Sequence, residues 1–277
     1  MQGRHLLIVG SLFALALSAP SSSGAQLSLS PSTPSGQSAS PAYEGWYKNQ
    51  DGSFSLSFGY YNRNDVEVLY APIGPDNSIS PGDLNQGQPA YFYPRRNWGV
   101  FAVKVPANFD VKAKVVWNVK IRGKSYAIPG SLNKDWQIDA LEGEAGSDNT
   151  PPALSFTEGG PEARGPGGAT FGPLTASVGK PITIDITAKD DGHSAGTVRG
   201  GVPVALAWFT HQGPVEVKFG TPTARLTPTG GKSSTTATFS KPGDYIVRVR
   251  ATDSAMASAG HAQCCWTNAF VKVRVTP

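Results

Sequence analysis

The sequence is poor in the residue types on which most catalytic and metal-binding sites depend. Its 277 residues include only two cysteines, two methionines and four histidines. None of the patterns G-x-S-x-G, H-E-x-x-H and G-x-x-x-x-G-K-[ST] occurs, which excludes the commonest serine-hydrolase, zinc-protease and P-loop sites. An enzyme is therefore the less favoured class, although the paired carboxylates of a glycosidase would leave no recognisable spacing.

Long hydrophobic runs are confined to the N-terminus. Residues 6–17 are almost entirely apolar, follow a basic start, and precede small and polar residues up to Ala25. This order is typical of a secretory signal peptide, and the run is shorter than the ~20 residues that a membrane-spanning helix needs. We therefore expect residues 1–25 to be a signal peptide. The mature protein, starting at Gln26, would be exported to the periplasm or the extracellular space without a membrane span.

Charge is also scarce. Charged residues make up 16% of the chain, against about 25% in typical proteins, and the formal net charge is +4. Nucleic acid is not an expected partner, because its binding needs a clustered basic face. Glycine and proline are abundant instead, at 32 and 23 residues, a balance that suits short strands joined by many turns.

Apolar and polar residues alternate along much of the chain, which predicts strands rather than helices. The pattern is clearest over residues 111–122, where Val111, Val115, Trp117 and Ile121 share one face. Other strands of this half are expected at residues 53–61, 66–70, 90–93, 100–105 and 125–128, with a turn-rich loop at 72–89. We predict an antiparallel β-sandwich over residues 43–142.

Two stretches rich in serine, proline and glycine divide the chain. Residues 26–42 are expected to form a flexible leader, and residues 143–173 a linker between domains. Beyond the linker, strands are expected at residues 174–178, 182–188, 202–208, 215–219, 235–239, 245–251 and 271–275. Seven short strands suffice for an immunoglobulin-like sandwich over residues 174–277. The predicted fold class is all-β, with two immunoglobulin-like antiparallel β-sandwich domains.

The second half contains Lys-Pro-Gly-Asp-Tyr at residues 241–245, followed by an alternating strand that ends at Asp253. This segment resembles the end of a polycystic-kidney-disease-type (PKD) domain, in which a Pro-Gly-x-Tyr turn enters the sixth strand. The resemblance covers about residues 174–276. It implies a tyrosine corner at Tyr245 and a buried Trp208 on the third strand, and it implies a fold rather than an activity. The ending Gln-Cys-Cys-Trp-Thr-Asn, residues 263–268, is also similar to that of a group of uncharacterised exported bacterial proteins.

The two cysteines, Cys264 and Cys265, are adjacent, which is unusual for a structural disulfide. A bond between neighbours closes a small ring and cannot staple two strands. Four states are open from the sequence: a vicinal disulfide that stiffens the loop, reduced thiols with a packing role, metal ligation, and an intermolecular bridge. Export to an oxidising compartment favours an oxidised state.

The predicted topology brings other polar residues to the same end of the second sandwich, where the second-to-third and sixth-to-seventh strand loops emerge together. The residues expected to converge there are Asp190, Asp191, His193, Asp253, His261, Cys264 and Cys265. Such a set suits calcium if only oxygen ligands contribute, and zinc or copper if histidine and cysteine do. The alternative is that the aspartates cap turns, since the spacing matches no standard ligand motif.

Aromatic and basic residues are clustered in the first half. The cluster consists of Tyr91, Tyr93, Arg95, Arg96 and Trp98. Planar rings beside arginine suit contact with carbohydrate or protein surfaces, but alternate members of the cluster could instead fill the core of the first domain.

The sequence thus supports two hypotheses of different class. The first is a non-catalytic exported binding or structural protein that contacts a glycan or a cell-surface protein through sandwich-end loops or the aromatic cluster. The second is a metal-binding protein or metal-dependent enzyme that uses the loops at residues 190–193 and 253–265.

Overall fold

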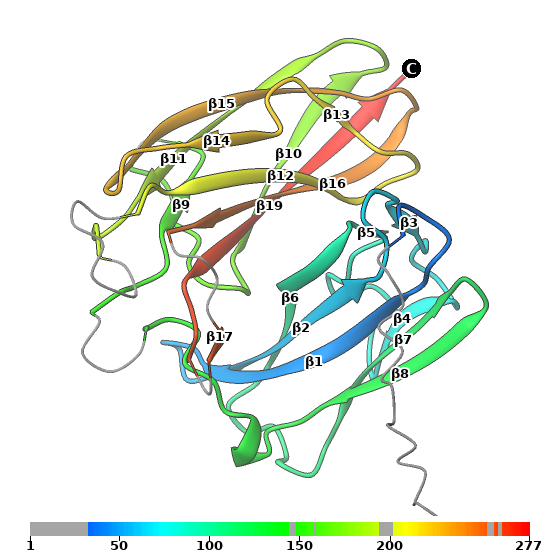
Figure 1. Ribbon diagram of the computed structural model, residues 1–277, viewed down its shortest axis with the longest axis vertical. Helices are drawn as coiled ribbons and strands as arrows, with labels where there is room; N and C mark the ends of the chain where they lie inside the picture. The colour runs from blue at the N-terminus through cyan, green and yellow to red at the C-terminus, as the bar shows by residue number, and fades with distance from the viewer. Residues whose placement is uncertain (1–32, 144–147, 158, 194–201, 254–257, 260–261) are drawn as a thin grey trace, which may run out of the picture. The chain divides into compact units, whose positions relative to one another are not determined.

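The computed structural model describes residues 33–143, 148–157, 159–193, 202–253, 258–259 and 262–277. The predicted signal peptide and His261 lie outside these residues. Ser32–Pro277 form one compact unit, and the regular secondary structure of its described part is nearly all strand (Figure 1). Among the described residues, one short 3-10 helix, η1 (Lys134–Trp136), interrupts the strands, and no helix is long and apolar enough to cross a membrane.

The first sandwich has two three-stranded antiparallel sheets and a two-stranded ribbon. One sheet has the order β1-β2-β6, the other β4-β7-β8, and the ribbon pairs β3 with β5. The strands are β1 (Ala39–Lys48), β2 (Phe54–Asn62), β3 (Leu69–Tyr70), β4 (Asn77–Ser80), β5 (Tyr91–Phe92), β6 (Arg95–Val105), β7 (Val115–Ile121) and β8 (Lys124–Gly130). Its core is aromatic: the Phe58 ring stacks on Phe101, and both rings meet Trp117 edge-on.

The second sandwich has a five-stranded sheet, β10-β19-β16-β12-β14, and a four-stranded sheet, β13-β15-β11-β9. Its strands are β9 (Ala153–Ser155), β10 (Ala169–Ser177), β11 (Ile182–Lys189), β12 (Ala205–Gln212), β13 (Lys218–Phe219), β14 (Thr223–Arg225), β15 (Gly230–Thr238), β16 (Gly243–Thr252) and β19 (Trp266–Thr276). The pair β10 and β19 is parallel, and the other pairs are antiparallel. A small hairpin, β17 (Ser258–Ala259) with β18 (Ala262–Gln263), precedes β19.

The alternation of the sequence explains the second core. Ile184 and Ile186 of β11 face Val247 and Val249 of β16 across one buried cluster, so each strand contributes every second residue. The predicted tyrosine corner is also present, since the Tyr245 hydroxyl donates to a carbonyl oxygen four residues upstream, at 2.9 Å. The prediction of two immunoglobulin-like antiparallel sandwiches is confirmed.

Several strand limits differ from those predicted. β7 begins at Val115 rather than at residue 111, because Asp110 closes a turn with the Ala113 and Lys112 amides, which leaves Val111 62% exposed. The strands expected at residues 66–70 and 215–219 shorten to β3 and β13. Conversely, strand β4 forms within residues 72–89, which were expected to be a loop.

The low-complexity stretches are also partly structured. β1 begins at Ala39, inside the expected leader, where small residues pair with the end of β2. The expected linker contains β9 and the start of β10, and its Leu154 is fully buried in the core of the second sandwich. Apolar residues among the prolines and glycines therefore anchor this segment.

Candidate functional site

Polar contacts join the two sandwiches along a surface that we call the sandwich interface. It is formed on one side by Tyr60, Gly87, Tyr91, Tyr93 and Gly99, and on the other by Thr210, His211, Gly213, Arg248, Trp266 and Asn268. One backbone bond also crosses it, from the Ala90 amide to the His211 carbonyl oxygen at 2.7 Å.

The tightest point of this interface is Gly99. Its carbonyl oxygen accepts from Asn268 Nδ2 at 2.6 Å and from Trp266 Nε1 at 3.4 Å. Its amide donates to Glu44, whose other carboxylate oxygen pairs with Arg96 at 2.5 Å. Burial raises the pKa of Glu44 to about 7, although Arg96 and the Gly99 amide oppose this rise. The glycine lets the indole of Trp266 lie directly on the backbone.

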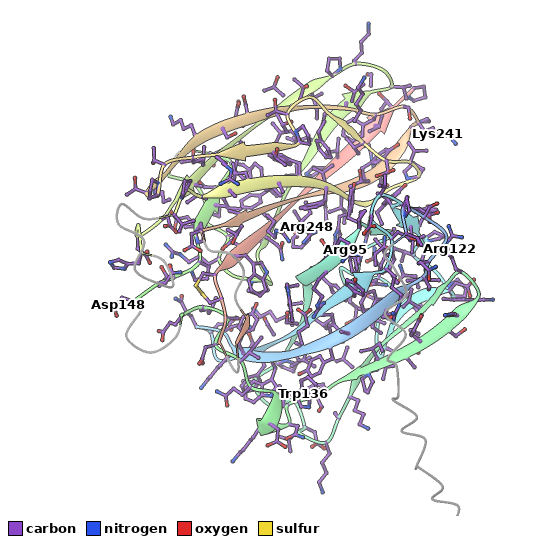
Figure 2. All side chains as sticks on the ribbon, in the orientation of Figure 1. Arg95, Arg122, Trp136, Asp148, Lys241 and Arg248 are labelled. Carbon is purple, nitrogen blue, oxygen red and sulfur yellow. A yellow bond between two sulfur atoms is a disulfide. The ribbon has the colours of Figure 1, made fainter. Side chains whose placement is uncertain are left out.

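Arg248 is buried in the same interface (Figure 2). Its Nη1 donates to Asn268 Oδ1 at 3.1 Å, and its guanidinium lies 4.4 Å from the centre of the Phe209 ring. Burial lowers the pKa of Arg248 to about 10. His211 is buried as well, and its burial together with the Arg248 charge lowers the pKa of His211 to about 3, so the imidazole is neutral. Its Nε2 lies 2.7 Å from the Gly87 carbonyl oxygen.

The aromatic cluster of the first half is divided by this arrangement. Tyr91 is 6% exposed and its hydroxyl donates to a second-sandwich carbonyl, while the Tyr93 hydroxyl accepts from the Thr210 amide at 2.9 Å. Arg96 lies over Trp98 at 3.6 Å from the ring centre and holds Glu44. Arg95 is the most exposed member, paired with Asp65 at 2.8 Å. Both tyrosines thus contribute to the contact between the sandwiches.

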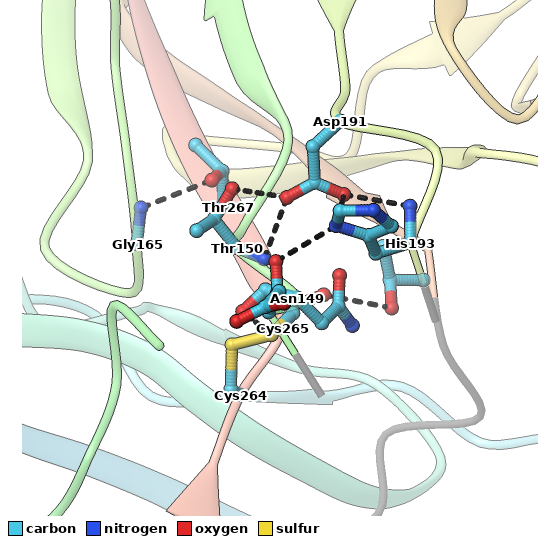
Figure 3. The surroundings of a disulfide bond; sticks show 10 residues. Asn149, Thr150, Gly165, Asp191, His193, Cys264, Cys265 and Thr267 are labelled. Carbon is cyan, nitrogen blue, oxygen red and sulfur yellow. Dashed lines mark hydrogen bonds and ion pairs between the residues drawn. A yellow bond between two sulfur atoms is a disulfide. The ribbon is translucent and has the colours of Figure 1, made fainter. Parts of the chain in front are cut away.

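At one end of the second sandwich, four stretches of the chain meet in what we call the loop end (residues 148–150, 190–193, 253 and 264–265). Asp191 Oδ2 accepts from the amide and the hydroxyl of Thr150, at 2.9 and 2.6 Å. His193 contacts the Asp148 carbonyl through Nδ1 at 3.0 Å and donates its amide to Asp191 at 2.7 Å. Figure 3 shows Thr150, Asp191 and His193 beside the cysteine pair.

The cysteine pair is a vicinal disulfide. Cys264 and Cys265 are bonded to each other and are 6% and 1% exposed. The bond lies just before β19, where Trp266 pairs with Thr252 of β16, and the Thr252 hydroxyl donates to the Cys265 carbonyl oxygen. Both sulfurs are therefore held at the point where the two strands meet the loop end.

Asp253, the residue after that strand pair, is fully buried. Neither of its carboxylate oxygens has a hydrogen-bond partner among the described residues, and the same holds for Oδ1 of Asp190 and Oδ1 of Asn149. Burial and the neighbouring Asp190 charge raise the pKa of Asp253 to about 7. The pKa of Asp190 rises to about 6, chiefly by burial, against the opposing hydrogen bond from the Gly192 amide.

Within the described part of the chain, no group of three or more histidine, cysteine, aspartate and glutamate side chains has the arrangement of a metal site. The predicted set is therefore only partly brought together. Asp190, Asp191 and Asp253 influence one another electrostatically, and the cysteines lie nearby, but both sulfurs are consumed by the disulfide. His193 is exposed and turned to a carbonyl.

Sequence reasoning missed Arg248 and Asn268 of the sandwich interface, Glu44, which supports Gly99 from behind, and Asn149 at the loop end. Arg248 alternates with the apolar row of β16 and therefore looked like part of a solvent face. A signal was available at the start of β19, where Trp-Thr-Asn-Ala-Phe shows no alternation of apolar and polar residues and the first six residues of the strand are all buried.

The chain matches no protein family and no curated protein. Among solved structures, the D0-D1 domain of intimin is 12% identical with a TM-score of 0.26, covering 86% of this chain and all of that one. Domains 4 and 5 of the S-layer protein SbsC are 12% identical with a TM-score of 0.24, covering 88% of this chain and 98% of that one.

The CARDB domain of a Pyrococcus furiosus protein, in complex with di-metal ions, is 13% identical with a TM-score of 0.28, covering 50% of this chain and 95% of that one. These scores are too low for any of the likenesses to carry an argument. The resemblances to a PKD domain and to exported bacterial proteins stay predictions.

Proposed function

We propose that this protein is a non-catalytic exported module that binds a glycan or a cell-surface protein through its loop end. The observation that carries the proposal is the ordering of separate chain segments there by Asp191, which holds Thr150 and the His193 amide at 2.6–2.9 Å. A surface assembled from strand-end loops on a rigid sandwich is a common way to build a recognition site.

The remainder of the molecule supports a binding or structural role over catalysis. His211 is fully enclosed and neutral, and Glu44 is bound to Arg96 and a backbone amide, so neither is placed to exchange a proton with a substrate. Arg95 and Trp98 retain part of the aromatic cluster as a second candidate contact surface.

A binding experiment tests the proposal. The purified protein would be applied to a glycan array and to immobilised envelope proteins, as wild type and as two variants, His193→Ala and Trp98→Ala. Lys241→Ala is the matched control, because Lys241 and the Asp148 segment lie at opposite ends of the second sandwich (Figure 2). Loss of binding in His193→Ala alone supports the loop end. Loss in Trp98→Ala alone would refute it in favour of the aromatic cluster, and equal loss in Lys241→Ala would refute both.

A further inference from the structure

The loop end contains an unusual concentration of buried oxygen atoms without hydrogen-bond donors. Asp253 is fully buried with both carboxylate oxygens unpartnered among the described residues. Asp190 contributes a third such atom, Oδ1, and the amide oxygen of Asn149, a residue that is 1% exposed, is a fourth. A buried polar atom without a partner costs about 1–3 kcal/mol, and a buried unpaired charge costs more.

These atoms belong to one cluster. The Asn149 side chain lies near enough to the Asp253 carboxylate to lower its pKa as a hydrogen-bond donor, although no well-formed hydrogen bond joins them. The charge of Asp190 raises the same pKa, so both groups are close neighbours of Asp253. The charged groups that face Asp190 are Asp253, Asp191, His193 and Arg164. Arg164 is engaged with Glu162, and His193 with Asp191, so neither cation neutralises Asp253.

We propose that Asp253, Asp190 and Asn149 bind one divalent cation of the calcium type. The ligand atoms are all oxygen, and two carboxylates match a double positive charge. Calcium accepts six to eight oxygen ligands in irregular geometry, whereas magnesium demands a near-ideal octahedron. With only two carboxylates and one amide from side chains, backbone carbonyls and water complete the coordination.

The vicinal disulfide decides against a soft metal. Zinc and copper sites in proteins are built mainly from thiolate and imidazole ligands, and both sulfurs here are bonded to each other. The imidazole of His193 contacts the Asp148 carbonyl instead of turning toward Asp253. The disulfide instead lies against the site, because Cys265 Sγ is 3.7 Å from the Asn149 carbonyl oxygen. The pair therefore packs against the Asn149 segment, beside the strand end that bears Asp253.

Isothermal titration calorimetry on the full mature protein, stripped with EGTA, tests the site without any binding partner. CaCl2, MgCl2 and ZnCl2 would be titrated into wild type, Asp253→Asn, Asp190→Asn and the control Asp244→Asn, whose carboxylate forms an exposed ion pair with Arg274. We expect one calcium ion per chain, bound at least 10-fold more tightly than magnesium. The binding should be lost in both site variants and retained in the control. Calcium at 100 times its Kd should raise the Tm by roughly 5–10 °C.

A second measurement guards against misfolding of the variants. In EGTA, Asp253→Asn should have a Tm equal to or above that of wild type, because the substitution removes a buried unpaired charge. Absence of heat and of a Tm shift with all three cations would overturn the proposal and indicate that the carboxyl groups share a proton. Binding of zinc but not calcium would overturn the oxygen-ligand assignment. Either result leaves the proposed recognition function standing, since that function is measured separately.

Discussion

A methyl group added at Gly99 should separate the two sandwiches. An ideal Cβ there would lie 2.4 Å from Cζ2 and 2.8 Å from Nε1 of Trp266, closer than real Cβ contacts. Gly99 also has a φ of +44°, which costs an L-residue about 1–2 kcal/mol. Overpacking a well-filled site costs about 1–3 kcal/mol more. We therefore expect Gly99→Ala to lower the free energy of unfolding by roughly 2–5 kcal/mol.

The control for this variant is Gly123→Ala in the β7–β8 turn. Gly123 has a φ of +73° and nothing within 4 Å of the added Cβ, so only the backbone cost of about 1–2 kcal/mol applies. Urea unfolding followed by tryptophan fluorescence and far-UV circular dichroism measures both variants. We expect wild type and Gly123→Ala to unfold in one transition and Gly99→Ala in two, because its interface is broken.

The clash with Trp266 can be tested directly in a double-mutant cycle. Trp266→Phe removes the indole atoms nearest to the added methyl, so Gly99→Ala should cost less in that background than in wild type. If the free energies of unfolding of Gly99→Ala and Gly123→Ala differ by less than about 0.5 kcal/mol, or the cycle shows no coupling, then Trp266 does not lie on Gly99.

Three further predictions concern other parts of the chain. Tyr245→Phe removes the hydrogen bond to the Lys241 carbonyl and should destabilise the protein by about 1 kcal/mol in urea unfolding; an unchanged midpoint would argue against a tyrosine corner. The pKa of His211 is lowered to about 3 in the folded state, so its stabilising contribution is present above pH 6.5 and is lost as the pH falls toward 3. Wild type should therefore lose up to about 1.4 kcal/mol per pH unit in this window relative to His211→Gln, and parallel curves would contradict the buried imidazole. Because Cys264 and Cys265 are buried and bonded, native protein should not react with iodoacetamide, and its intact mass should rise by two hydrogens after denaturing reduction; labelling without reductant would contradict the disulfide.

Alternation predicted the strands that have one face in a core and the other exposed. β11 is the clearest example, with buried Ile184, Ile186 and Ala188 separated by exposed or half-buried residues. β1 was missed because most of its residues are at least partly buried on both faces and a bulge between Tyr43 and Gly45 shifts the register. Neither feature leaves a period of two in the sequence.

The short strand β4 was missed for a different reason. Its sequence is Asn-Ser-Ile-Ser, which has little strand propensity. Asn77 is nevertheless fully buried, because its side chain donates to the Ala71 and Pro89 carbonyls and accepts from the Trp117 indole. Long-range hydrogen bonds of this kind depend on residues 6 to 40 positions away and cannot be inferred from the local pattern.

The sequence could predict which loops form the candidate site, but not which of its side chains are buried without hydrogen-bond partners. The topology of an immunoglobulin-like sandwich brings the loops after β11 and β16 to one end, so the proximity of Asp190 and Asp253 followed from strand order. Which side chains are buried without partners did not follow from it. Asn149 belongs to the predicted linker and only the folded chain brings it against Cys265.

The two buried charged regions of the molecule differ in one respect that bears on function. In the sandwich interface, Glu44 has both Arg96 and the Gly99 amide, and Arg248 has the Asn268 amide oxygen and the Phe209 ring. Each of these charges has partners supplied by the chain itself, as a purely structural contact requires, although Nε of Arg248 makes no hydrogen bond.

At the loop end the opposite holds for Asp253: neither carboxylate oxygen makes a well-formed hydrogen bond, the Asn149 side chain is the one donor group beside it among the described residues, and Asp190 and Asp191 are like-charged neighbours. In the absence of a cation, its contribution to stability should be full below pH 3.8 and lost as the pH rises through about 7, because the folded state takes up a proton that the unfolded state lacks. Calcium should abolish this loss by replacing the proton. Urea unfolding at pH 5 and pH 8, with EGTA or with CaCl2, measures the difference. If the free energy of unfolding depended on pH equally in both buffers, the carboxyl groups would bind a proton and no metal ion.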